Sequence, residues 1–192
     1  MKKRTAFLGA ILSLIPFGQS LLLQNVVVLS ITGWMLVLPE NLYAESFEFY
    51  FDRGFDKGEK GDHNGAISDF TKAIKINPEY PEAYYNRGVA KRKLKDYYGS
   101  ISDYTKAIEI NPNYIEAYLN RGVAKGKLKD FYGAISDYTK AIEINPKNKS
   151  GYKNRGIAKE LIGDMEGACA DWRQTIFIFP NDAAKKWVRD QC

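Results

Sequence analysis

A proline recurs at one fixed interval along most of this chain. Pro78, Pro112, Pro146 and Pro180 keep this interval, and each follows an apolar-rich stretch with helical spacing. A tyrosine, an arginine and a glycine keep it too: Tyr50, Tyr84, Tyr118 and Tyr152; Arg53, Arg87, Arg121 and Arg155; Gly54, Gly88, Gly122 and Gly156. A fixed period of about 34 residues is typical of stacked helical repeats. The sequence therefore predicts an all-α fold, a right-handed α-solenoid of four helix-turn-helix units.

Within one period, the pattern predicts two helices joined by a turn. Residues 82–94 place apolar and small side chains at helical spacing, Asp96 opens a turn, and residues 97–110 repeat the helical spacing. Asn111 and Pro112 end the second helix, because a proline disfavours the helical conformation in the residue before it. We expect small residues where the helices approach closely and aromatic rings between them. These packing residues are Tyr84, Gly88, Tyr104, Ala107, Tyr118, Gly122, Tyr138, Ala141 and Gly156.

These residues carry a resemblance to a known family. The stretch AYYNRGVAKRKLKDYYGSISDYTKAIEINP, followed by AYLNRGVAKGKLKDFYGAISDYTKAIEINP, is similar to the tetratricopeptide repeat (TPR) family. The family pattern has an aromatic residue, a glycine four residues later, then a small residue, an aromatic residue and an alanine in the second helix. The fourth unit departs from it at Trp172 and Thr175. The resemblance covers about residues 46–180 and implies four repeats, at 47–80, 81–114, 115–148 and 149–180.

The two ends of the chain are predicted to differ from the repeats. Lys2, Lys3 and Arg4 precede an apolar region, whose segment 21–38 has no charge. We interpret residues 1–44 as a signal peptide, cleaved after Ala44, or as a single membrane-spanning anchor; a helix packed on the repeats is the remaining alternative. Both a signal peptide and a membrane anchor would place the repeats on the extracytoplasmic side, as in a small exported or membrane-anchored bacterial-type TPR protein. Residues 181–192 are expected to form a helix that caps the array.

The resemblance also indicates a binding groove. Three asparagines stand two residues before a repeat glycine, at Asn86, Asn120 and Asn154. In this family that position faces the concave groove, and the series resembles the asparagine ladder of the O-linked N-acetylglucosamine transferase repeats, which holds an extended peptide by its backbone. An amide offers a donor and an acceptor, so it suits a peptide group. The alternative is that each asparagine braces a neighbouring helix.

The remaining groove positions favour an apolar or mixed peptide. They are Tyr85, Val89, Leu119 and Val123. Chaperone-binding TPR proteins have lysine and asparagine at comparable positions, where they clamp a C-terminal carboxylate. The sequence therefore argues against capture of a C-terminal carboxylate.

Charged residues also recur, and each has a structural and a functional interpretation. Every repeat arginine is followed, at one constant interval, by an aspartate, which predicts an ion pair across the hairpin; binding of an acidic partner is the alternative. Lysine runs at 91–95 and 125–129 close first helices, where cations suit the helix dipole. Alternatively, they help to capture a partner.

No catalytic constellation is evident, and we expect neither an enzyme nor a cofactor or metal site. His63, the single histidine, stands where later repeats have aromatic packing residues. Without residues 1–44, the chain has 25 basic and 22 acidic residues, a net charge of +3, which is too small an excess to favour nucleic acid. The main hypothesis is a protein-interaction scaffold that binds a peptide segment or partner subunit of unknown identity. The alternatives are a structural or assembly protein acting through the array ends, and, third, a binder of RNA or an anionic surface.

Two cysteines lie near the C-terminus, at Cys169 and Cys192. Export would place them in an oxidising compartment, where a disulfide can persist. A buried thiol at Cys169 and a free Cys192 form the alternative.

Overall fold

The computed structural model describes residues 26–31, 34–39, 46–178, 188 and 192 of the 192-residue chain. The chain divides into two compact units, Met1–Glu40 and Asn41–Cys192. Each unit is described separately below.

The N-terminal unit contains a pair of antiparallel strands. Strand β1 spans Val26–Ile31 and strand β2 spans Trp34–Pro39, with Val26 opposite Pro39 and Ile31 opposite Trp34. The expected helix over residues 21–38 is therefore wrong for these two segments. The β-branched run VVVLSI has strong strand propensity, which competes with the helical interpretation of an uncharged stretch. Among the described residues, no helix is long and apolar enough to cross a membrane. Residues 1–25 and Ala44, which carry the rest of that expectation, lie outside the described residues.

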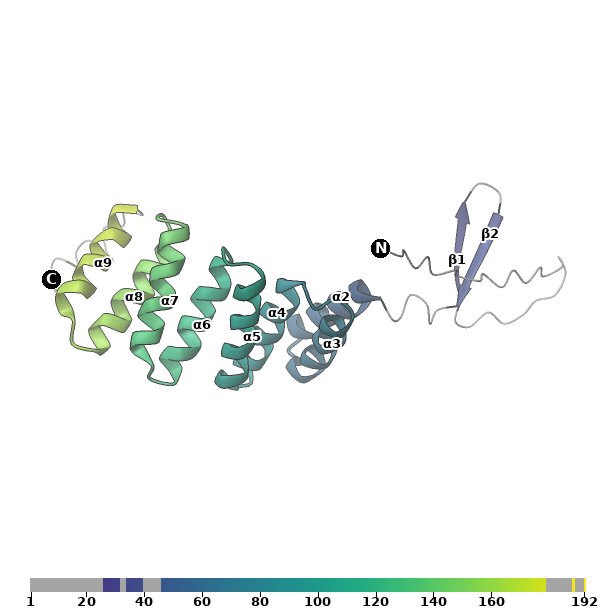
Figure 1. The fold of residues 1–192 in the computed structure, drawn as a ribbon, viewed down its shortest axis with the longest axis horizontal. Helices are drawn as coiled ribbons and strands as arrows, with labels where there is room; N and C mark the ends of the chain where they lie inside the picture. Colours follow the sequence, from purple (N-terminus) through teal and green to yellow (C-terminus); the bar gives the residue numbers. More distant parts are fainter. Residues whose placement is uncertain (1–25, 32–33, 40–45, 179–187, 189–191) are drawn as a thin grey trace, which may run out of the picture. The chain divides into compact units, whose positions relative to one another are not determined.

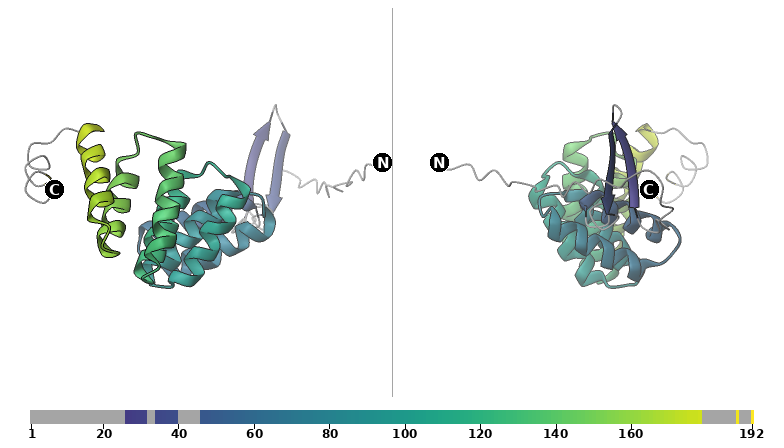
Figure 2. Two further views of the ribbon diagram at one scale, coloured as in Figure 1. Left: turned by 60° about the vertical axis from the view of Figure 1, so that its left-hand side comes forward. Right: turned by 90° about the vertical axis from the view of Figure 1, so that its right-hand side faces the viewer.

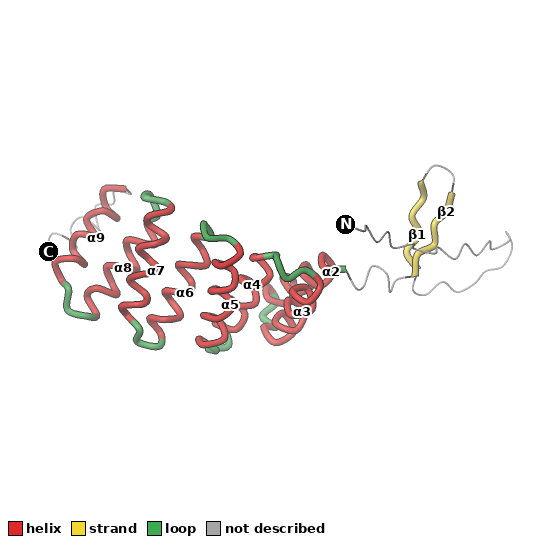
Figure 3. The backbone as a smooth tube through the Cα atoms, in the orientation of Figure 1, coloured by secondary structure: helices red, strands yellow, loops and turns green. Residues whose placement is uncertain are grey.

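The second unit contains helices in four successive hairpins (Figures 1 and 3). The hairpins are α2 (Phe47–Glu59) with α3 (His63–Ile76), α4 (Pro81–Lys93) with α5 (Tyr97–Ile110), α6 (Ile115–Lys127) with α7 (Phe131–Ile144), and α8 (Lys149–Leu161) with α9 (Met165–Ile178). Each hairpin stacks on the next through its second helix, so α3 contacts α4, α5 contacts α6 and α7 contacts α8. Figure 2 shows this one-directional stacking from two further sides. The predicted helical solenoid is confirmed.

Aspartate caps explain where the second helices begin. The side chains of Asp62, Asp96 and Asp130 accept a hydrogen bond from the backbone N–H of the glycine three residues later, and Asp164 bonds Gly167 in the same way. Such a cap satisfies one of the N–H groups that a helix start leaves unpaired. The turn before the cap requires a left-handed residue in every hairpin. Gly61 and Gly163 supply it with φ of 84°, whereas the middle repeats use Lys95 and Lys129 with φ of 65° and 64°.

Inside each hairpin, a first-helix glycine packs against an aromatic ring of the second helix. The pairs are Gly54 with Phe70, Gly88 with Tyr104, Gly122 with Tyr138, and Gly156 with Trp172. A Cβ atom at Gly122 would lie 2.7 Å from Cε1 of Tyr138, so only glycine permits this approach. Tyr104, Ala107 and Ala141 are fully buried. Tyr84 is buried together with Ala107, Ile108 and Ala117, and the half-buried Tyr118 packs against this cluster.

Charged side chains also link the two helices of each hairpin. Each repeat arginine donates two hydrogen bonds to the aspartate 16 residues later, from Nε and Nη2 to the two carboxylate oxygens. A lysine from the first helix pairs with the same aspartate. In the last three repeats the arginine Nη1 also donates to a threonine hydroxyl of the preceding repeat. The predicted ion pair is confirmed, and these arginines therefore have structural partners on two sides.

The C-terminal end is tied back to α9. A disulfide joins Cys169 to Cys192, with their Cα atoms 5.7 Å apart. Val188 is buried against Ala168, Cys169 and Trp172. Arg173 Nη2 donates to the Cys192 carbonyl at 3.1 Å. Other residues of the expected capping helix at 181–192 lie outside the described residues, so its helical form stays a prediction.

Candidate functional site

The first helices of the repeats present a face of half-buried side chains. We call it the groove face and define it by the residues that the sequence assigned to a groove: Tyr85, Asn86, Val89, Leu119, Asn120, Val123 and Asn154. They come from α4, α6 and α8, and all are half-buried. A half-buried side chain is held in place yet still accessible to a partner, so the face suits binding better than a fully solvated surface does.

The three asparagines of this face do not have equal surroundings. Asn120 Nδ2 donates to the Tyr85 hydroxyl at 3.1 Å and to the Glu116 carbonyl at 2.9 Å. The bond to Tyr85 joins α6 to α4. Asn120 therefore braces two neighbouring repeats, which is the structural interpretation of this position.

Asn86 and Asn154 have no hydrogen bond from their side-chain amides within the described part of the chain. The residue at the position of Tyr85 in each preceding repeat explains why these two amides lack such a hydrogen bond. Tyr85 precedes its partner Asn120 by 35 residues. At the same offset before Asn86 and Asn154 stand Phe51 and Leu119, which have no hydroxyl group. The amides of Asn86 and Asn154 thus retain their hydrogen-bonding capacity for a partner.

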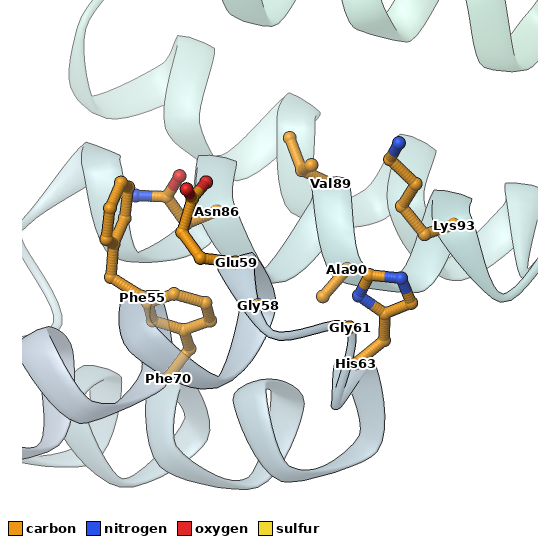
Figure 4. A pocket seen from close by; sticks show the side chains of 10 residues that line it. All are labelled: Phe55, Gly58, Glu59, Gly61, His63, Phe70, Asn86, Val89, Ala90 and Lys93. Carbon is orange, nitrogen blue, oxygen red and sulfur yellow. The ribbon is translucent and has the colours of Figure 1, made fainter.

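Asn86 lines a pocket of about 360 Å³ between the first and second repeats. Figure 4 shows that side chains of α2, α3 and α4 surround this space. Its apolar lining includes Phe55, Phe70 and Val89, and its charged lining is Glu59 and Lys93. Phe55 is 50 % exposed although it is a large aromatic residue.

Asn154 lines an equivalent pocket of about 310 Å³ between the third and fourth repeats. Its lining matches that of the first pocket at a shift of two repeats: Val123 for Phe55, Gly126 for Gly58, Phe131 for His63, Tyr138 for Phe70, Ile157 for Val89 and Leu161 for Lys93. Ile157 and Leu161 are 41 % and 58 % exposed. The array therefore repeats one apolar pocket at alternate repeat interfaces.

A glycine keeps each pocket open. A Cβ atom at Gly58 would approach only Ala66, at 3.9 Å, and one at Gly126 would meet nothing within 4 Å. Neither glycine is required by packing or by positive φ, unlike Gly122 or Gly61. Glycine in a helix costs about 0.5–1 kcal/mol relative to alanine. These two residues thus lower helix stability, and their effect on the surface is to leave space.

The second repeat has an arginine, Arg92, at the repeat position where the first repeat has Gly58 and the third has Gly126. Arg92 lies beside Tyr104, the register equivalent of the pocket residues Phe70 and Tyr138. Burial raises the pKa of Tyr104 to about 12, and the adjacent Arg92 acts in the opposite direction, by hydrogen bonding and by its charge. Arg92 Nε and the Tyr104 hydroxyl are both buried. Arg92 therefore places a charged side chain at the middle interface, at the position where the first and third interfaces have a glycine.

The sequence pattern placed the groove-face residues on the first helices but gave no indication of Gly58, Arg92 and Gly126. The sequence does mark this position, because it varies between otherwise similar repeats. The four repeats have Gly58, Arg92, Gly126 and Glu160 there. His63, expected to be a packing residue, lines the first pocket. Among the described residues, no cluster of histidine, cysteine, aspartate or glutamate could hold a metal ion.

Family comparison agrees with the hairpin geometry. The tetratricopeptide repeat model matches residues 81–114 and 115–148, and a TPR repeat model matches residues 59–95. The chain therefore contains tetratricopeptide repeats, a class of protein–protein interaction module. No relative was found among curated proteins.

Solved structures show the same fold. MamA is 24 % identical with a TM-score of 0.70, over 77 % of this chain and 84 % of MamA. The first TPR of Spaghetti (RPAP3), bound to the HSP90 peptide SRMEEVD, is 25 % identical with a TM-score of 0.60, over 62 % and 95 %. YrrB, described as a TPR protein with an unusual peptide-binding site, is 21 % identical with a TM-score of 0.68, over 78 % and 77 %.

Proposed function

We propose that this protein is an interaction scaffold that binds an extended peptide segment of a partner protein on its groove face. The observation that carries the proposal is the pair of asparagines, Asn86 and Asn154, each at the edge of an open apolar pocket with its amide unbonded among the described residues. An amide can pair with a peptide group of any sequence, while an apolar pocket selects a side chain. Such a combination suits an extended chain.

Two of the similar solved structures support a peptide as ligand. Spaghetti is described with a bound peptide and YrrB with a peptide-binding site. The groove face of this chain differs from a carboxylate clamp because Tyr85, Val89 and Leu119 hold its central positions. We therefore propose an internal segment of the partner as the ligand and not its C-terminus.

We also propose that the repeats work in an oxidising compartment on the far side of a membrane. The bridge between Cys169 and Cys192 supports this, because disulfides persist where the thiol pool is oxidising. The basic N-terminus and the apolar stretch after it are the sequence features that favour export. Alkylation of the protein in intact cells, before lysis, tests the proposal: protected cysteines support it and two labelled cysteines contradict it.

Site-specific crosslinking tests the proposed function. A photoreactive phenylalanine replaces Phe55, which lines the first pocket, in the full-length protein in its native cells. The matched control carries it at Tyr98, which is 77 % exposed on α5 and lines neither of the two groove-face pockets. Both substitutions exchange one exposed aromatic residue for another, so the array should tolerate them equally.

We expect the residue at position 55 to crosslink one stretch of a partner protein, and position 98 not to do so. Crosslinks of equal yield from both positions would contradict a groove-bound segment. Crosslinks exclusively between copies of this chain would instead support the assembly alternative, and sedimentation of the purified protein at several concentrations would then show oligomers.

A further inference from the structure

The repeat interfaces differ at two positions of the repeat. The first and third interfaces have a glycine-floored pocket with an unbonded asparagine, whereas the second has Arg92 in place of the glycine and an asparagine bonded to Tyr85. The two differences occur together at one interface and are absent from both others. The groove face is therefore patterned with a period of two repeats, although the sequence motif returns in every single repeat.

We infer that the groove face selects an extended segment with two apolar side chains, one for each pocket, and an acidic side chain between them that pairs with Arg92. This inference rests on the proposed function and specifies its ligand. Arg92 is half-buried and makes no ion pair with a carboxylate within the described residues, and a guanidinium group donates readily to a carboxylate. Its Nη atoms would donate to the partner carboxylate.

Charge along the groove face favours the same ligand. Lys93 lines the first pocket and Lys127 lines the second, so cations stand on both sides of Arg92. The nearby carboxylates are Glu59, at the first pocket, Glu116, which acts on Tyr85, and Glu82, which acts on the adjacent Tyr114. Of these charged groups, Arg92 stands at the repeat position of the two pocket glycines, so it is the one that an acidic residue at the centre of a peptide would meet.

Helix packing sets the spacing between the two apolar side chains. The first helices contact one another in series, α2 with α4, α4 with α6 and α6 with α8. Packed helices lie about 8–10 Å apart, so two repeats separate the pockets by roughly 16–20 Å. An extended chain in the polyproline II conformation advances about 3.1 Å per residue and turns once in three residues, so every third side chain points to the same face. The two apolar residues should therefore lie about six positions apart, with the acidic residue at the midpoint, three positions from each.

The test uses capped synthetic peptides and the full-length protein. The reference probe is acetyl-Leu-Ser-Ser-Glu-Ser-Ser-Leu-amide, whose leucines are six positions apart. A second probe replaces the glutamate by glutamine, and a third replaces one leucine by serine. Dissociation constants are measured by NMR titration. Circular dichroism and thermal unfolding show that every protein variant retains its fold.

We expect the glutamate probe to bind the wild-type protein about tenfold more tightly than the glutamine probe. In Arg92→Gln this ratio should fall below about twofold. Gly58→Leu and Gly126→Leu should each weaken binding of the reference probe about tenfold. They should weaken binding of the third probe, which has one leucine, by a smaller factor. Glu160→Leu is the matched control, because Glu160 is the exposed register equivalent in the last repeat and lines neither pocket. Arg92→Gly should reverse the preference, so that a leucine-centred peptide binds best.

Any one of three results would overturn the inference. The first is an unchanged dissociation constant in both glycine variants, and the second is a glutamate preference that persists in Arg92→Gln. The third is absence of binding by every probe. If a partner segment identified by crosslinking at position 55 binds the wild-type protein and both glycine variants equally, the inference fails while the proposed function stands. If no groove crosslink exists, the proposed function fails as well.

Discussion

Asp137 accepts hydrogen bonds from Nε and Nη2 of Arg121, at 3.0 and 2.7 Å, while its side chain is almost completely buried. Lys125 lies 2.9 Å from the same carboxylate. Arg121 Nη1 donates to Thr105 of the preceding repeat at 3.0 Å. One buried carboxylate thus holds its own hairpin together and, through its arginine, orients the interface with the preceding repeat.

Removal of this carboxylate should destabilise the array strongly. In Asp137→Ala, Arg121 and Lys125 lose their shared partner inside the hairpin, and loss of one member of a buried pair costs about 3–5 kcal/mol. Chemical denaturation followed by circular dichroism measures the change. Lys140→Ala is the control, because Lys140 pairs with Glu143 on the exposed surface and should unfold like the wild type. Equal effects of the two substitutions would contradict the role of the buried pair.

The pH dependence of stability should reflect the same arrangement in the first repeat. Arg53 lowers the pKa of Asp69 below its ordinary value, with Lys57 acting in the same direction. A lowered folded-state pKa stabilises the protein above the unfolded value of about 3.9, and this stabilisation is lost as the pH falls through the folded-state pKa. The stability difference between wild type and Asp69→Asn should therefore be constant near pH 6 and shrink below about pH 4. A difference that grows in acid would refute this sign.

Two glycines of α6, four residues apart, should respond oppositely to substitution. Gly122→Leu forces a side chain into Tyr138 and should cost about 1–3 kcal/mol or more. Gly126→Ala adds a methyl group to open space and should stabilise the helix by about 0.5–1 kcal/mol. Urea denaturation midpoints of both variants measure the contrast. Destabilisation by Gly126→Ala would show that the glycine is needed for folding, against our account of the pocket.

The repeat architecture could be predicted from the sequence because each packing rule recurs at a fixed interval. Gly122 and Tyr138 keep the offset found in the other repeats, as do Arg121 and Asp137, so four examples supported each pair. The apolar stretch before the repeats had no such repetition. Its lack of charge indicated a helix, while the described segments at 26–31 and 34–39 form strands.

The groove face was harder to predict because function here depends on departures from the repeat. Asn120 keeps the repeat pattern, yet its hydrogen bond depends on the hydroxyl of Tyr85, which no other repeat has at that position. Arg92 and Gly126 likewise differ from each other at one repeat position. A periodic sequence predicts what neighbouring repeats share, and the residues that distinguish them become informative only when their surroundings are known.

The disulfide should stabilise the C-terminal end of the array. Cys169 and Cys192 are 23 residues apart, and closing a loop of this length contributes about 3 kcal/mol in the chain-entropy model. Cys192→Ser should therefore lower the unfolding midpoint and expose the cluster around Trp172, with a matching change in tryptophan fluorescence. Intact mass and thiol labelling without reductant establish the bridge in the purified protein. Two freely labelled cysteines would contradict it.

Calorimetric titration of the segment that crosslinks at position 55 shows whether Asn86 and Asn154 hold the bound peptide. The segment is titrated into the wild-type protein, the double variant Asn86→Ala with Asn154→Ala, and the control variant Asn120→Ala. We expect the double variant to keep its helicity and bind at least tenfold more weakly. Asn120→Ala should lower stability, because Tyr85 and α4 lose their brace, and should affect binding less. If the double variant binds as tightly as the wild type, these asparagines do not hold a peptide and the account is wrong.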